Sequence, residues 1–311
     1  MKNIGQDRVL TGMLCAVGFE ALYGLSFLFT KQATEMASIF TLLSWRFFVA
    51  VVVLSLLAAF GVVKINLKGK PIKPLLPVIL FDPCLYFIGE TIGVDRTTAT
   101  ESGVFLACIP VAALLASAVV LKKRPSGRQI VGILITLVGV LITVLAVGVS
   151  SSLSKVGYLL LVVTVLSYAL YSVFVDRAAR WYTGAEITYS MLIAGASLFV
   201  ILAVIEALIH GNMTTLVTFP FREHTFLTAI LYQGIGCSIV AFLLNNMAIA
   251  KIGVNRTASF TGVQTVVTIL AGALLLRETF TWWQLLGAVV ILLGVYTANV
   301  RKKRQEESTV A

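Results

Sequence analysis

The sequence predicts an all-α membrane protein with ten transmembrane helices, arranged as two inverted-topology five-helix repeats with both termini in the cytoplasm. Three observations support this prediction: the apolar composition, the distribution of Lys and Arg between the apolar stretches, and the similarity of the two halves. Hydrophobic residues make up 59% of the 311 residues and charged residues only 12%, whereas a soluble globular chain is about a quarter charged. A soluble all-helical protein would need polar helix faces, and these are mostly missing.

The chain divides into ten apolar stretches, each close to the roughly 20 residues that a helix needs to cross a bilayer. Turn and charge signals such as KINLKGKPIKP and KKRPSGR separate them. The predicted spans are 9–30, 38–62, 75–94, 98–121, 128–149, 156–176, 185–209, 226–250, 256–276 and 281–299. The first stretch has no small-residue cleavage site, so we expect a retained helix rather than a signal peptide.

The positions of Lys and Arg predict the orientation. With the N-terminus inside, 18 of the 24 basic residues fall in inner segments, 5 fall in outer segments, and Arg46 lies within a span. Cytoplasmic loops of membrane proteins carry such an excess. The net charge of +10 is therefore interpreted as a topology signal rather than as a nucleic-acid-binding surface.

The second half of the chain repeats the first. Residues 101–140 align without a gap on residues 256–295, an offset of 155, and Tyr23 aligns with Tyr168 at an offset of 145. The first alignment preserves a Q-x-x-G-x-x-x-x-x-x-G pattern: Gln129/Gln284, Gly132/Gly287 and Gly139/Gly294. A repeat of five spans is odd in number, so the second copy must enter the bilayer from the opposite side. Inverted repeats of this kind are typical of transporters.

The order of motifs resembles the drug/metabolite transporter superfamily, specifically its ten-helix type with two EamA domains. The resemblance covers roughly residues 10–299 and includes YGLSFLFTK, SWRFF and IGVNRTASFTGVQTVVTILAGALLLRETFTWWQLLGAVVILLGV. The second half departs from the family pattern at Thr265, which aligns with Pro110, and at Arg277 before Glu278. The predicted units are a first EamA-like repeat at 9–149, a second at 156–299, and a basic and polar cytoplasmic tail at 300–311. The resemblance implies secondary transport, commonly efflux of small metabolites or drugs.

The segment FDPCLYFIGET, residues 81–91, places two acids within a predicted span. Asp82, Tyr86 and Glu90 have i, i+4, i+8 spacing, which puts them on one stripe of a helix, and Pro83 can kink that helix beside Asp82. An ionised carboxylate facing lipid costs about 2.5–3.5 kcal/mol even on insertion scales. We therefore expect the stripe to face protein or water. The alternatives are that Glu90 snorkels to the outer surface and that Asp82 pairs with a structural partner.

Glu20 lies about 16 Å into the first span at 1.5 Å per residue, near the bilayer midplane. Tyr23 follows on the same helix face. The sequence predicts that Glu20 binds a proton or a cation in a central cavity. The alternative is a neutral Glu that forms a hydrogen bond within a helix interface.

Arg46 is the one basic residue within a predicted span. A lone buried cation is unfavourable, so we expect a carboxylate partner, and depth in the bilayer favours Glu90 or Glu101. The two interpretations are a structural salt bridge and a clamp for an anionic group of the substrate. Polar residues in spans of the second half, among them Tyr168 and Gln264, are further candidates to bind a ligand.

These residues predict a secondary active transporter of small metabolites or drugs, amine-bearing or amino-acid-like, that exports them across the bacterial plasma membrane by proton-coupled alternating access. A passive facilitator or channel is the alternative. An intramembrane enzyme is disfavoured because the sequence has no G-x-S-x-G or H-E-x-x-H motif and no His within a span. The four cysteines have no CxxC spacing, so no cofactor or metal site is predicted. The expected partners are the substrate, protons and the lipid bilayer, with no nucleic acid, and the chain is expected to be a monomer or homodimer.

Overall fold

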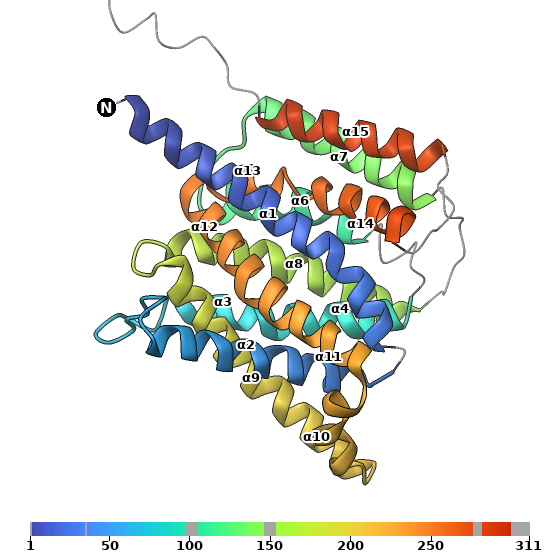
Figure 1. The fold of residues 1–311 in the computed structure, drawn as a ribbon. Helices are drawn as coiled ribbons and strands as arrows, with labels where there is room; N and C mark the ends of the chain where they lie inside the picture. The colour runs from blue at the N-terminus through green and yellow to red at the C-terminus, as the bar shows by residue number, and fades with distance from the viewer. Residues whose placement is uncertain (1, 35, 98–104, 146–153, 276–281, 300–311) are drawn as a thin grey trace, which may run out of the picture.

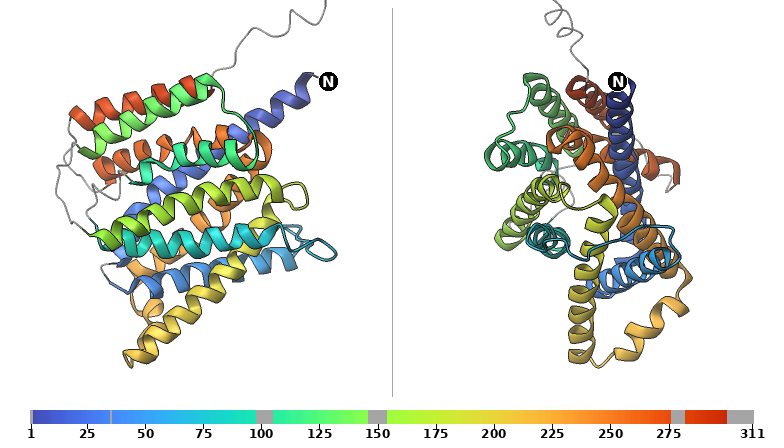
Figure 2. Two further views of the ribbon diagram at one scale, coloured as in Figure 1. Left: turned by 180° about the vertical axis from the view of Figure 1, so that it is seen from behind. Right: turned by 90° about the vertical axis from the view of Figure 1, so that its left-hand side faces the viewer.

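The computed structural model describes the chain except for residues 1, 35, 98–104, 146–153, 276–281 and 300–311. The described residues are nearly all helical and contain no strand. The helices lie roughly side by side in a stack, with α7 and α15 at one edge and α9 and α10 at the other (Figure 1, Figure 2).

The first half begins with the long helices α1 and α2, and the second half begins with α8 and α9. The elements of the first half are α1 (Lys2–Thr34), α2 (Ile39–Ala59), α3 (Leu75–Ile79), η1 (Leu80–Leu85), α4 (Tyr86–Asp95), α6 (Ile109–Val120) and α7 (Gly127–Leu145). Those of the second half are α8 (Lys155–Ala178), α9 (Gly184–Ile209), α10 (Met213–Arg222), α11 (His224–Leu231), η2 (Tyr232–Ala241), α12 (Phe242–Ile252), α13 (Val254–Ala258), α14 (Gly262–Leu275) and α15 (Trp282–Asn299).

Each of the ten predicted spans contains helix in the part of the chain that the structure describes. Among the described residues, seven stretches are long and apolar enough to cross a membrane: Asp7–Ser26, Ile39–Ala59, Leu75–Gly93, Lys155–Ala178, Gly184–Ile209, His224–Ile252 and Trp282–Asn299. Two shorter apolar helices cover Ile109–Val120 and Gly127–Thr143. The prediction of a multi-span helical protein is confirmed, while the count of ten crossings stays a prediction. The start of α1 and the end of α15 lie at the same end of the bundle (Figure 1), and the side of the membrane they face also stays a prediction.

Equivalent helices of the two halves make equivalent packing contacts. Helix α1 packs on α12 and α14, and its counterpart α8 packs on α4 and α6. A Cβ added at Gly12 of α1 would lie 2.5 Å from the side chain of Ile252, and one at Gly157 of α8 would lie 2.5 Å from the side chain of Thr97. Gly12 and Gly157 are related by the offset of 145, and Thr97 and Ile252 by the offset of 155. The same contact therefore occurs twice: once from a glycine of the first half to the second half, and once from the equivalent glycine of the second half to the first.

Helices α7 and α15 meet along the glycines of the repeated motif. A Cβ at Gly132 would lie 2.6 Å from the carbonyl oxygen of Gly294, and one at Gly139 would lie 2.9 Å from that of Gly287. The lower number in one helix faces the higher number in the other, so the helices are antiparallel. Small residues allow such close backbone approach between membrane helices. Exchanging the two repeats turns the contact of Gly132 with Gly294 into that of Gly287 with Gly139, so a pseudo-twofold axis passes between these helices, as inverted repeats require.

A second antiparallel contact joins α2 to α9. The rings of Phe47 and Phe199 stack with centroids 5.3 Å apart, and Phe47 also makes an edge contact with Phe87 of α4 at 5.3 Å. Gly195 gives Phe47 its space, since a Cβ there would lie 2.5 Å from the ring. In this buried aromatic cluster, Phe47 and Phe87 of the first half contact Phe199 of the second half, beside the cavity described next.

Candidate functional site

A cavity of about 300 Å³ lies between the two halves. This volume is at the lower end of the range for small-molecule sites, roughly 300–1,000 Å³. Its lining comes from α1, α6, α7, α8, α14 and α15 and from the interrupted helices of residues 75–95 and 224–252. The polar lining residues are Glu20, Tyr23, Asp82, Tyr86, Glu90, Thr136, Thr143, Tyr168, Asn245, Thr261, Gln264, Thr265, Thr268 and Gln284.

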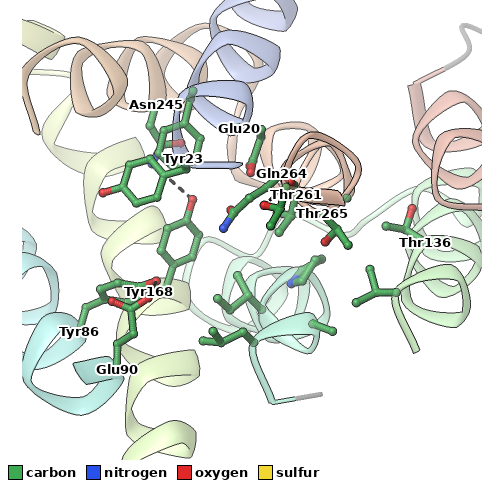
Figure 3. A pocket seen from close by; sticks show the side chains of 18 of the residues that line it. Glu20, Tyr23, Tyr86, Glu90, Thr136, Tyr168, Asn245, Thr261, Gln264 and Thr265 are labelled. Carbon is green, nitrogen blue, oxygen red and sulfur yellow. Dashed lines mark hydrogen bonds between the residues drawn. The ribbon is translucent and has the colours of Figure 1, made fainter. Parts of the chain in front are cut away.

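Glu20 and Tyr23 lie one turn apart on the face of α1 that borders the cavity. Glu20 is only 2% exposed, and its Oε2 atom has no hydrogen-bond partner. Figure 3 shows Glu20 on the same side of the cavity as Gln264 and Thr261. A buried polar atom without a partner is costly, so Glu20 is a group that a ligand or a proton can satisfy.

Asp82 lies where the third predicted span is interrupted. Its backbone is extended (φ −145°, ψ 120°) between α3 and α4, and a cis peptide bond joins it to Pro83. The expectation of one continuous helical stripe through Asp82, Tyr86 and Glu90 is therefore wrong at Asp82, because the chain leaves helical geometry there, although the expected kink beside Pro83 is present. Asp82 still reaches the cavity. It is 3% exposed, and its Oδ1 atom has no partner.

Tyr86 and Glu90 keep their predicted relation on one face of α4. The Tyr86 hydroxyl donates a hydrogen bond of 3.2 Å to Glu90 Oε1. Across the cavity wall, the rings of Tyr86 and Tyr168 are 5.9 Å apart, and the Tyr168 hydroxyl accepts a hydrogen bond of 3.4 Å from Asn245 Nδ2. In Figure 3 Tyr86 and Glu90 lie on the side opposite Glu20, with Tyr168 between them. The acids therefore occupy two separate positions around one cavity.

Arg46 lies behind the cavity wall without a carboxylate partner among the described residues, so the predicted ion pair with Glu90 is wrong. Its Nε atom donates to Ser238 Oγ at 2.8 Å, and its terminal nitrogens donate to Gln233 Oε1 and Tyr23 Oη, each at 3.2 Å. The guanidinium also lies 4.8 Å from the centroid of the Phe87 ring. Neutral acceptors and an aromatic face can compensate a buried guanidinium. The other predicted partner, Glu101, lies outside the described residues.

Several lining residues were not predicted to belong to the site. Thr136 and Thr143 come from α7, Thr261 and Thr268 from the region of α14, and Gln284 from α15. Thr268 also donates to the carbonyl oxygen of Gly24 at 2.9 Å, which links α14 to α1. A threonine in an apolar helix gives no signal of the face it occupies, whereas Gln284 was visible as the first residue of the repeated Q-x-x-G motif.

The described residues contain no group of three or more His, Cys, Asp or Glu side chains placed to hold a metal ion. The carboxyl groups of Glu20, Asp82 and Glu90 instead share their cavity with tyrosine rings, hydroxyls and carboxamides. Such a site can bind protons, ammonium groups and hydrogen-bond donors.

Two repeats of inverted packing around a cavity lined by polar side chains define a polytopic membrane protein of the transporter class. The chain belongs to the EamA-like transporter family, whose model matches residues 10–145 and residues 155–300. It is thus a transporter of the drug/metabolite superfamily and not an enzyme.

Known proteins resemble the chain over most of its length. An uncharacterized transporter of Bacillus subtilis, YcxC, is 32% identical over 295 residues, covering 94% of each chain. A probable amino-acid metabolite efflux pump of Escherichia coli is 25% identical over 175 residues, 56% of this chain and 58% of the pump. One crystal structure superposes with a TM-score of 0.76 at 18% identity, covering 94% of this chain and 96% of the other. This structural similarity supports the fold alone.

Proposed function

We propose that this protein is a secondary active transporter that exports small amine-bearing or amino-acid-like metabolites, or drugs, across the bacterial plasma membrane in exchange for protons. The observation that carries the proposal is the presence of Glu20, Asp82 and Glu90 around one cavity. A carboxyl group in such a cavity binds either a proton or a cationic group, and the two compete for the same oxygen atoms. This competition is what couples the export of one to the import of the other.

Alternating access is supported by the exchange symmetry of the two halves. The cavity is bordered by Tyr23 of α1 and by Tyr168 of α8, which are equivalent in the repeat. In transporters with inverted repeats, the halves exchange conformations and open one central site to each side in turn. Because a single chain provides the complete lining, either a monomer or a homodimer of independent units would serve.

Export is supported by the Escherichia coli relative, which is described as a probable amino-acid metabolite efflux pump. The location in a bacterial plasma membrane is supported by the apolar spans and by bacterial transporter relatives. Protons are the proposed coupling ion because the acids face the cavity, and no cofactor enters the proposal.

The experiment has two stages. First, the metabolites released by cells with and without the protein are compared at two external pH values, which identifies substrates. Second, the purified protein is placed in liposomes that contain a pH-sensitive dye, and proton movement is recorded when a released metabolite is added. We expect substrate flux to move protons in the opposite direction, and both fluxes to be lost in Glu20→Gln and Asp82→Asn.

Glu206→Gln is the matched control, because Glu206 borders a separate cavity near His210 and does not line the central one. It should transport like the unmodified protein. Normal transport with an unchanged pH profile in both Glu20→Gln and Asp82→Asn would refute proton coupling through these acids. Flux that moves no protons and needs no pH gradient would favour the passive facilitator.

A further inference from the structure

The cavity presents hydrogen-bond acceptors that have no donor. Glu20 Oε2, Asp82 Oδ1 and Asn245 Oδ1 are all buried and without a partner, and all three residues line the cavity. The Nδ2 atom of Asn245 is already used, since it donates to Tyr168 Oη and Tyr171 Oη at 3.4 and 3.3 Å. Asn245 therefore offers its oxygen rather than its nitrogen to a ligand. Three unsatisfied acceptors call for a ligand rich in N–H donors.

Aromatic rings surround these acceptors. Tyr23 is 4.9 Å from Phe19 and 6.2 Å from Phe242, centroid to centroid, and the rings of Tyr86 and Tyr168 lie on the other side of the cavity. The face of an aromatic ring attracts a cation, with an energy of about 2 kcal/mol or more when both are desolvated. The rings also give an apolar ligand body a surface to pack on.

No lysine or arginine lines the cavity among the described residues. The nearby cation, Arg46, is 5% exposed and directs its guanidinium at Ser238, Gln233 and Tyr23. These three bonds hold the guanidinium in place, and Arg46 does not itself line the cavity. The earlier interpretation of Arg46 as a carboxylate clamp does not fit this geometry.

We infer that the cavity selects organic ammonium compounds that lack a carboxylate, and discriminates against the corresponding amino acids. This inference rests on the proposed function and narrows its substrate class. An ammonium group donates to a free acceptor of the lining, Glu20 Oε2 or Asp82 Oδ1, while its hydrocarbon or aromatic body packs on the tyrosines. An added carboxylate finds no free cation in the described lining and faces the acids that already hold the ammonium group.

Binding is tested with matched pairs that differ only by the carboxylate: tyramine against tyrosine, and cadaverine against lysine. Titration calorimetry on the full chain in lipid nanodiscs should give a Kd for each amine at least about tenfold lower than that of its amino acid, a difference of about 1.4 kcal/mol. Equal affinities within each pair, tighter binding of the amino acids, or no binding of either amine would overturn the inference.

Variants assign the binding to the cavity. Glu20→Gln and Asp82→Asn should each weaken amine binding at least about tenfold, and Glu206→Gln should not. Size-exclusion profiles show whether each variant is folded, and Asn245→Leu gives a third, uncharged change of the lining that should also weaken binding. Amine binding that survives all three changes would overturn the inference.

The same protein in liposomes separates the two proposals. Amine binding without any proton-linked flux overturns the proposed coupling and leaves the inference standing. Proton-linked export of tyrosine or lysine without amine binding overturns the inference and leaves the proposed transport standing.

Discussion

The glycine contact between α7 and α15 gives a prediction whose magnitude follows from the distances. In Gly139→Ala the new methyl group would lie 2.7 Å from the backbone nitrogen of Ile291 and 2.9 Å from the carbonyl oxygen of Gly287, whereas ordinary contacts are 3.4–4 Å. Backbone atoms cannot rotate away, so the helices must separate by at least about half an ångström. Overpacking of this kind costs about 1–3 kcal/mol.

Thermal unfolding of the purified protein in nanodiscs measures this loss. One kcal/mol lowers the Tm by about 2–4 °C in chains of 150–250 residues, so we expect Gly139→Ala to lower the Tm by at least about 2 °C. The symmetry adds a second requirement. Gly294→Ala meets the carbonyl oxygen of Gly132 at 2.7 Å, so it should lower the Tm to a similar extent.

Gly127→Ala is the matched control on the same helix, because nothing lies within 4 Å of its added Cβ. Gly127 is the first residue of α7, and its backbone is not in the left-handed region, so this variant should be about as stable as the unmodified protein. The reasoning is refuted if Gly139→Ala is as stable as Gly127→Ala, because α7 and α15 would then not meet at these residues.

Three further substitutions test buried polar contacts through the same unfolding measurement. Glu186→Ala removes the acceptor of Lys70, whose Nζ lies 2.6 Å away, and should cost about 1–3 kcal/mol; a Tm equal to that of the unmodified protein would contradict the ion pair. Arg46→Lys should also lower the free energy of unfolding by about 1–3 kcal/mol, since a lysine ammonium cannot reproduce the geometry of the planar guanidinium. An unchanged Tm would contradict the hydrogen bonds of Arg46 described above. Asn246→Leu leaves the Tyr171 hydroxyl, now 2.7 Å from Asn246 Oδ1, without its acceptor; the drop in Tm should be smaller when Tyr171→Phe is added, and additive losses would refute the contact.

Much of the fold followed from the sequence because the bilayer restricts the possibilities. Apolar stretches long enough to cross lipid must form helices that satisfy their own backbone groups, and the repeated Q-x-x-G spacing predicted which parts of the two halves correspond. The glycines of that motif then proved to face each other across a symmetry axis. The exact ends of helices were less predictable: the second span was expected to reach residue 62, and α2 ends at Ala59.

The acids of the site were predictable for a related reason. A carboxylate within a span cannot face lipid cheaply, so Glu20 and Asp82 had to face the interior, and both line the cavity. The neighbours of Arg46 were not predictable, because Gln233 and Ser238 lie 187 and 192 residues away along the chain. The depth of Arg46 in the membrane suggested a carboxylate partner, but tertiary packing places neutral side chains next to its guanidinium.

The scaffold is symmetric, but its charge is not. The offsets that relate Gly12 to Gly157 and Thr97 to Ile252 also pair the three acids that line the cavity with neutral residues of the second repeat: Glu20 with Val165, Asp82 with Cys237, and Glu90 with Asn245. Under the proposed exchange of conformations, α1 takes the packing role that α8 has now, so Glu20 would enter the environment that surrounds the buried Val165. Because the surroundings of the Glu20 carboxyl group would differ between the two conformations, its proton affinity would differ between them as well. Proton uptake on one side and release on the other then follow from the exchange itself, because the acids that line the cavity all belong to the first repeat.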